Sequence, residues 1–126
     1  NKDYVAFTET FLEELYAFKK GKVLFKPTKA SKNQFREDKN GFISYFIGRN
    51  KISDEDKGFA LNPWVMVEFK NESINIYDNL ATAMGNYFFT DPQGEKTKVE
   101  FSFVYKKNKE GEIKIVLHHS SFPFSG

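Results

Sequence analysis

Four side chains that can donate or accept protons stand together near the end of the chain: His118, His119, Ser120 and Ser121. They follow an apolar run at residues 115–117, and the sequence contains no other histidine. Histidine is the side chain whose ordinary titration falls near neutral pH. Residues 118–121 are therefore the first place where the sequence indicates acid–base chemistry.

The apolar run predicts a β-strand over residues 112–121, and strand alternation assigns these four side chains to two faces. His119 and Ser121 fall on the more apolar face, whereas His118 and Ser120 fall on the other. If the apolar face turns inward, burial would keep His119 neutral, and a neutral imidazole can act as a base. A purely structural role, at backbone groups or a dimer seam, stays open. Zinc held by both histidines is disfavoured, because neighbouring strand residues point apart.

The elements that must position these groups begin with a helix. Residues 3–20 carry apolar side chains at intervals of three and four, which is typical of an amphipathic helix. The apolar positions are Tyr4, Phe7, Phe11, Leu12, Leu15 and Phe18. Asp3 is the expected N-cap and Gly21 the expected C-terminal stop.

The remainder of the chain predicts strands. Residues 23–25 form a short strand, and residues 35–47 are interpreted as a hairpin turned at Asn40-Gly41, with Tyr45 in its second strand. The charged residues 49–58 are expected to form an exposed loop. Further strands are expected at 64–70, 74–76, 84–90, 99–105 and 112–121, with turns at 71–72, 91–94 and 108–111. One long N-terminal helix and about six strands predict an α+β fold with a curved antiparallel sheet.

Composition limits the alternatives. The 126 residues favour a single domain over 1–126, and fifteen Phe and six Tyr supply an aromatic core or an apolar cavity. A net charge of +2 with both signs interspersed gives no footprint for nucleic acid. The chain has no cysteine, no apolar run of the ~20 residues that span a bilayer and no starting Met, so we expect a mature or excised domain without membrane contact. Phosphate-loop and esterase motifs are absent.

Several stretches together resemble the iota-class carbonic anhydrases. They are residues 23–28 (VLFKPT), 44–46 (SYF), 56–60 (DKGFA), 83–89 (AMGNYFF) and 118–121 (HHSS). That family is related to the association domain of calcium/calmodulin-dependent kinase II and shares its nuclear-transport-factor-2-like cone. The resemblance spans nearly the whole chain, and its specificity comes from the order and spacing of the stretches.

The resemblance implies reversible hydration of CO2 to bicarbonate in a small cavity of the cone, in a class with metal-free members and members described with manganese or zinc. The absence of cysteine and the divergent directions of the two histidines favour the metal-free version, with no cofactor. Carried onto this sequence, the implied catalytic hydroxyls are Thr28, Tyr45 and one serine of residues 118–121. The face argument favours Ser121, with His119 beside it as the group that accepts or relays the proton. Substrate contacts are expected from His118, Ser120, Tyr87 and Phe89.

Two other functions remain open. One is a non-catalytic assembly module, for which the aromatic-rich strands at 64–70 and 99–105 could supply an interface. The other is a small-molecule-binding or isomerase-type cone, for which Asp78 is the nearest candidate base. We expect a homodimer, because one outer sheet face is apolar. The resemblance places the protein in plastids or in bacteria, and the chain itself does not decide between them.

Overall fold

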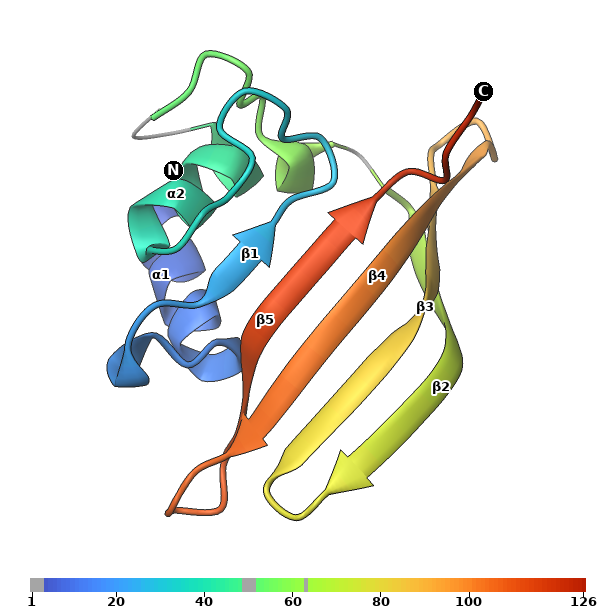
Figure 1. The fold of residues 1–126 in the computed structure, drawn as a ribbon. Helices are drawn as coiled ribbons and strands as arrows, with labels where there is room; N and C mark the ends of the chain where they lie inside the picture. Colours follow the sequence, from blue (N-terminus) through green and yellow to red (C-terminus); the bar gives the residue numbers. More distant parts are fainter. Residues whose placement is uncertain (1–3, 49–51, 63) are drawn as a thin grey trace.

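The computed structural model describes residues 4–48, 52–62 and 64–126, and these build one five-stranded sheet and a set of helices (Figure 1). In chain order the elements are α1 (Tyr4–Leu15), the 3-10 helix η1 (Phe18–Lys20), β1 (Leu24–Lys26), α2 (Lys39–Ile47), the 3-10 helix η2 (Phe59–Leu61), β2 (Met66–Tyr77), β3 (Leu80–Thr90), β4 (Lys96–Lys107) and β5 (Ile113–Ser121). The strand order is β1-β5-β4-β3-β2. Only β1 runs parallel to its neighbour, β5.

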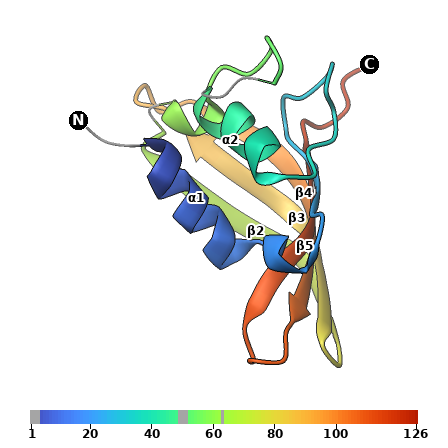
Figure 2. The ribbon, with the colours of Figure 1, turned by 90° about the vertical axis from the view of Figure 1, so that its left-hand side faces the viewer.

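The α1 and α2 helices lie on the same side of the curved sheet, which we call its inner face (Figure 2). The core lies between these two layers. Its buried side chains include Leu12 and Tyr16 from the end of α1, Phe42 and Ile43 from α2, and Val99, Phe101 and Phe103 from β4. The expected α+β fold with a curved, mainly antiparallel sheet is confirmed, with five strands among the described residues in place of about six.

The hairpin expected over residues 35–47 is wrong, because residues 39–47 form the helix α2 and not a strand. Asp38 caps the helix by accepting a hydrogen bond of 2.9 Å from the Gly41 backbone N–H. The Asn40-Gly41 pair thus lies in the first helical turn. Phe42 and Phe46, like Ile43 and Ile47, stand four residues apart, and the helix buries Phe42, Ile43 and Ile47. A short apolar run fits either element, and the cap at Asp38 favours the helix.

The N-terminal helix is shorter than expected. It ends at Leu15, and Gly21 terminates η1 with a φ of 136°. The expected cap Asp3 lies outside the described residues. The expected apolar stripe is also divided: Leu12 is fully buried, whereas Phe7 is 72% and Phe11 49% exposed. The helix therefore uses only part of its apolar surface in the core.

The turn expected at residues 71–72 is a β-bulge inside the continuous strand β2. Asn71 pairs with Gly85 and Ser73 pairs with Met84, so Glu72 is an extra residue. The strand bends there because Gly85 has no side chain: a Cβ at Gly85 would lie 2.3 Å from the Lys70 carbonyl oxygen. The bulge also places Phe69 and Ile74 on the same face, although simple alternation would separate them.

Candidate active site

A second bulge, in β5, decides which of the four side chains at residues 118–121 point inward. Val104 of β4 pairs with Leu117 and Tyr105 pairs with Ile115, so Val116 is the extra residue. Ile115 faces the core, and beyond the bulge the buried positions become His118 (8% exposed) and Ser120 (1% exposed).

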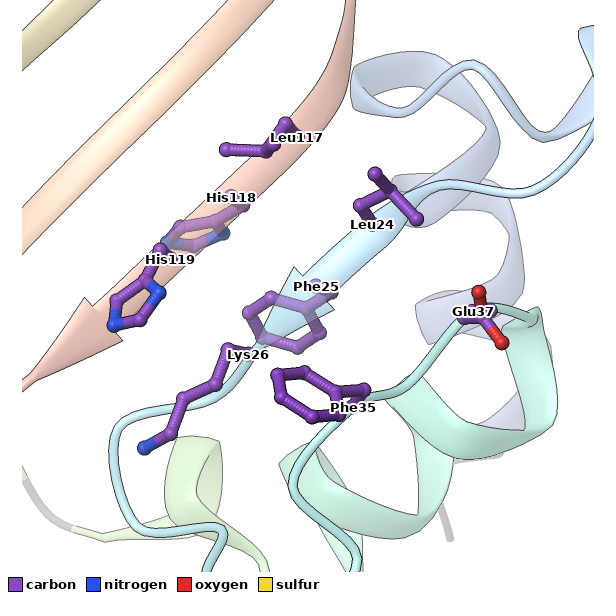
Figure 3. A pocket seen from close by; sticks show the side chains of 8 residues that line it. All are labelled: Leu24, Phe25, Lys26, Phe35, Glu37, Leu117, His118 and His119. Carbon is purple, nitrogen blue, oxygen red and sulfur yellow. The ribbon is translucent and has the colours of Figure 1, made fainter.

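The expectation that His119 and Ser121 share the buried face is therefore wrong. His119 is exposed, and the partly exposed Ser121 donates a hydrogen bond of 3.4 Å to Glu100 Oε1. Figure 3 shows His119 beside Lys26 and His118 behind the strand next to Phe25, and residues on both sides line a groove of about 370 Å³. The physical reason is the bulge, which shifts the alternation of β5 by one residue.

His118 is surrounded by three hydroxyl groups from three different elements. Its Nδ1 shares a hydrogen bond of 2.9 Å with the hydroxyl of Tyr16, which follows α1. Its Nε2 lies 2.9 Å from Ser120 Oγ and 3.2 Å from the hydroxyl of Tyr87 on β3. Tyr87 and Ser120 also hydrogen-bond to each other. Both ring nitrogens are thus engaged.

The imidazole of His118 is held in its neutral form. Its ring centroid lies 4.2 Å from that of Phe103 and 4.8 Å from that of Phe25. Burial among these rings, with a smaller contribution from the charge of His119, lowers the pKa of His118 to about 3. A neutral imidazole has one N–H donor and one acceptor nitrogen, so it can receive a hydrogen bond on one side and donate one on the other.

Thr28 and Tyr45 extend this arrangement. Thr28 follows β1 and is buried, and Tyr45 projects from α2. The Lys29 backbone N–H donates to the Tyr45 hydroxyl oxygen over 3.1 Å, which leaves the phenol proton free to donate. The Thr28 side chain hydrogen-bonds to both Tyr45 and Tyr87 and partly offsets the effect of burial, which raises the pKa of Tyr45 to about 12 and also raises that of Tyr87.

The structure thus brings five of the candidate residues into what we call the buried polar cluster: Thr28, Tyr45, Tyr87, His118 and Ser120. Phe89 lies beside it, with its ring centroid 5.2 Å from that of Tyr87. Sequence analysis missed Tyr16 as a partner of His118. The available signal was its spacing of four residues from Leu12, which places both on one face of a helical segment.

A buried ion pair supports the segments that carry Thr28 and Tyr45. The guanidinium of Arg36 bonds to both carboxylate oxygens of Asp56, at 2.8 and 2.9 Å, and Ser44, next to Tyr45, also bonds to Asp56. Glu55 accepts backbone N–H bonds from residues 31–33. Of the exposed loop expected at residues 49–58, residues 49–51 lie outside the described residues, and the expectation is wrong at Ser53 (8% exposed) and Asp56 (1% exposed).

Other expected features occupy different places. Asp78, the candidate isomerase base, lies exposed in the turn between β2 and β3, so it does not contact the buried polar cluster. In the expected interface strand at 99–105, Val99, Phe101 and Phe103 belong to the core. Within the described residues, no three His, Cys, Asp or Glu side chains gather as metal ligands would, and no helix is both long and apolar enough to cross a bilayer.

Comparisons with known proteins identify the relatives of this chain. The model of the metal-independent carbonic anhydrase family matches residues 1–122. A metal-independent carbonic anhydrase from Nostoc sp. is 44% identical over 94% of this chain, which spans 58% of that relative's length. The crystal structure of a cyanobacterial iota-carbonic anhydrase complexed with bicarbonate superposes with a TM-score of 0.90 at 42% identity, over 97% of this chain and 75% of that one.

More distant structures share the fold alone. A protein assigned as a ketosteroid isomerase from Parabacteroides distasonis has a TM-score of 0.65 at 16% identity, over 92% of this chain and 75% of that one. A protein assigned as a calcium/calmodulin-dependent kinase II association domain from Thiobacillus denitrificans has a TM-score of 0.63 at 16% identity, over 96% of this chain and 89% of that one. The match to the family model over nearly the whole sequence, together with the 44% identical relative, shows that this chain belongs to the metal-independent carbonic anhydrase family.

Proposed function

We propose that this chain catalyses the reversible hydration of CO2 to bicarbonate without a metal, at the buried polar cluster. The observation that carries the proposal is the buried polar cluster itself, in which the Tyr87 and Ser120 hydroxyls contact the neutral imidazole of His118 and Thr28 and Tyr45 extend the row of hydroxyls. Family membership supports it, as does the bicarbonate named in the related cyanobacterial structure. The chain spans 58% of the length of the Nostoc relative.

The surroundings of the cluster suit both forms of the substrate. CO2 is apolar, and the rings of Phe89, Phe59 and Trp64 form a continuous aromatic wall between Tyr87 and Tyr45. Bicarbonate is an anion that needs hydrogen-bond donors. Tyr45 and Tyr87 keep their protons at neutral pH because burial raises the pKa of each phenol. Both side chains are therefore donors.

The reaction follows from these roles. The oxygen of a water held by the hydroxyl groups forms a bond to the carbon of CO2, and one C=O π electron pair moves to its oxygen. The hydroxyls of Tyr45 and Tyr87 donate to that oxygen as its negative charge develops, as donors of an oxyanion hole do. The water proton passes to a hydroxyl oxygen of the cluster and then to solvent, which leaves bicarbonate. Orientation of the water supplies a large part of the rate.

We assign to Ser120 the role of catalytic hydroxyl that alternation gave to Ser121, whereas His118 takes the buried position expected for His119 but not its role as proton acceptor. A His118 side chain with a pKa of about 3 does not store a proton at neutral pH. Its function is to position other groups. One ring nitrogen accepts a hydrogen bond and the other donates one, which fixes the directions of the hydroxyl groups of Ser120, Tyr87 and Tyr16.

CO2 hydration measured by stopped-flow pH change on chelator-treated protein tests this proposal. Neighbouring serines provide a matched pair: Ser120→Ala removes a cluster hydroxyl, whereas Ser121→Ala removes one on the other face. We expect treated wild-type protein to remain active, Ser120→Ala to lose about 10²-fold in rate and Ser121→Ala to stay within about twofold of wild type. Equal losses in both variants would refute the assignment, and inactive wild-type protein would favour a non-catalytic assembly module.

We further propose that the protein forms a homodimer through the inner side of β2 and the exposed side of α1. Phe69 (63%), Ile74 (52%) and Ile76 (79%) of β2 are exposed, as are Phe7 and Phe11 of α1. Exposed apolar surface of this kind favours association. Light scattering should give twice the chain mass, and Ile76→Lys should give the monomer. The cyanobacterial relative supports a bacterial setting, with a plastid as the alternative.

A further inference from the structure

A cleft of about 850 Å³ borders Tyr16. It is formed where the end of α1 and η1 lie beside the start of β5 and the end of β4 (Figure 1). Seven lysines line it: Lys19, Lys20, Lys22, Lys106, Lys107, Lys109 and Lys114. We call it the lysine cleft. Of the buried polar cluster and its partners, only Tyr16 borders it.

The positive charge of the lysine cleft is not balanced locally. Seven lysines face three glutamates, a net charge of +4, while the whole chain carries only +2. Among the described residues, six of the seven lysines have no carboxylate within ion-pair distance, and only Lys22 has one, that of Glu37 at 3.8 Å. Glu13 is already paired with Lys39 at 2.6 Å, outside the cleft. The cleft therefore concentrates ammonium groups that lack counter-charges.

The chain holds the two sides of the lysine cleft together. Lys114 Nζ donates to the carbonyl oxygens of Glu13 and Glu14, at 3.0 and 2.7 Å, and so links the start of β5 to the end of α1. Lys19, Lys20 and Lys22 line the cleft from η1 and the residues after it, and the other four lysines line it from β4, β5 and the turn between them. The lysines thus line one concave space from both sides, and a concave site focuses their field.

We propose that the lysine cleft binds a small anion with several negative charges, of the phosphate class. Lysines act as mobile point charges toward phosphate oxygens, and seven of them can surround such a group. The glutamates favour a compact ligand, because Glu110 and Glu112 on one side and Glu13 on the other would repel a polyanion that extended beyond the cleft. The cleft is thus an anion site separate from the candidate active site.

Calorimetric titration with sodium tripolyphosphate at low ionic strength tests this site without any activity measurement, so its result is independent of the proposed function. The variant Lys19→Ala/Lys107→Ala removes two charges from the lysine cleft. Its matched control, Lys70→Ala/Lys98→Ala, removes two exposed, unpaired lysines from β2 and β4. We expect the cleft variant to weaken binding about tenfold and the control to weaken it less than about twofold.

Saturable binding that weakens as salt is added, and that only the cleft variant loses, would support the site. Absence of binding at low salt would overturn the proposal, and so would equal losses in both variants, because they would reflect net charge alone. Circular dichroism of both variants establishes that they are folded. Anionic phospholipid vesicles are the comparison probe: binding to vesicles without binding to tripolyphosphate would also overturn the proposal, in favour of a membrane-facing surface.

Discussion

Burial of His118 as a neutral imidazole makes stability depend on pH in a way that can be worked out from the structure. Its pKa is about 3 in the folded protein and near 6.5 when the chain is unfolded. The unfolded state therefore binds the proton more tightly, and acid favours unfolding. The stabilisation is fully present above pH 6.5 and is lost progressively as the pH falls from there toward 3.

The size of the effect follows from the same two values. Each pH unit below 6.5 costs about 1.4 kcal/mol of folding free energy, so the protein should lose about 2 kcal/mol between pH 7.5 and pH 5 from this one group. Urea unfolding at both pH values measures the loss. His118→Gln and His119→Gln form the matched pair, since they replace adjacent histidines on opposite faces of β5.

His118→Gln should lose most of this pH dependence, whereas His119→Gln should retain it. Carboxylates that titrate in the same range contribute equally to all three proteins, so the difference between wild type and variant isolates the imidazole. The same pH dependence in wild type and His118→Gln would refute the reasoning. Loss of the dependence in His119→Gln instead would show that the inward face of β5 had been assigned wrongly.

Three further changes follow from the geometry. Tyr45→Phe keeps the ring but removes the donor toward the developing oxyanion, so the stopped-flow CO2 hydration rate should fall about 10²-fold with the circular dichroism unchanged; a full rate would exclude Tyr45 from the site. Gly85→Ala forces a Cβ onto the β2 backbone at the bulge and should lower the free energy of unfolding in urea by about 2 to 3 kcal/mol; an unchanged value would mean that the bulge adjusts freely. Glu55, whose pKa is held at about 2 by hydrogen bonds from residues 31–33, should stabilise the fold above pH 4.5 and progressively less toward pH 2. Glu55→Gln should therefore cost about 1 to 3 kcal/mol at pH 7, measured by urea unfolding, and an equal stability at pH 7 would contradict this role.

Much of the fold was accessible from the sequence because its signals are local. The period-two pattern of β4 and the turns at residues 91–94 and 108–111 predicted the β3–β4 and β4–β5 hairpins, whereas the turn between β2 and β3 was not predicted. The helix α2 was missed because a nine-residue element with a broad apolar face resembles a strand. Its deciding feature, the cap at Asp38, is one side chain among many polar ones.

The sequence predicted which types of side chain form the candidate site, but not which of them point inward. The sequence indicated the imidazole, the hydroxyls and the resemblance that grouped them, whereas the inward face of β5 depends on a bulge opposite Val104 and Tyr105. A bulge is defined by pairing with another strand, so alternation along one strand cannot reveal it. Arg36 and Asp56 were missed for a related reason: charged residues are normally exposed, and only their mutual contact permits burial.

The bulge at Val116 has a consequence for how this protein can tolerate insertions and deletions. A chain that lost Leu117 while keeping the bulge at Val116 would exchange the two faces of β5 beyond that point, which in most strands would replace every buried group by an unrelated one. Here the residues occur in identical adjacent pairs, two histidines and then two serines. The exchange would bring His119 and Ser121 inside in place of His118 and Ser120. The strand thus presents an imidazole and a hydroxyl to the interior in either alternation. A change of one residue in the length of the strand would therefore keep both kinds of side chain at the site.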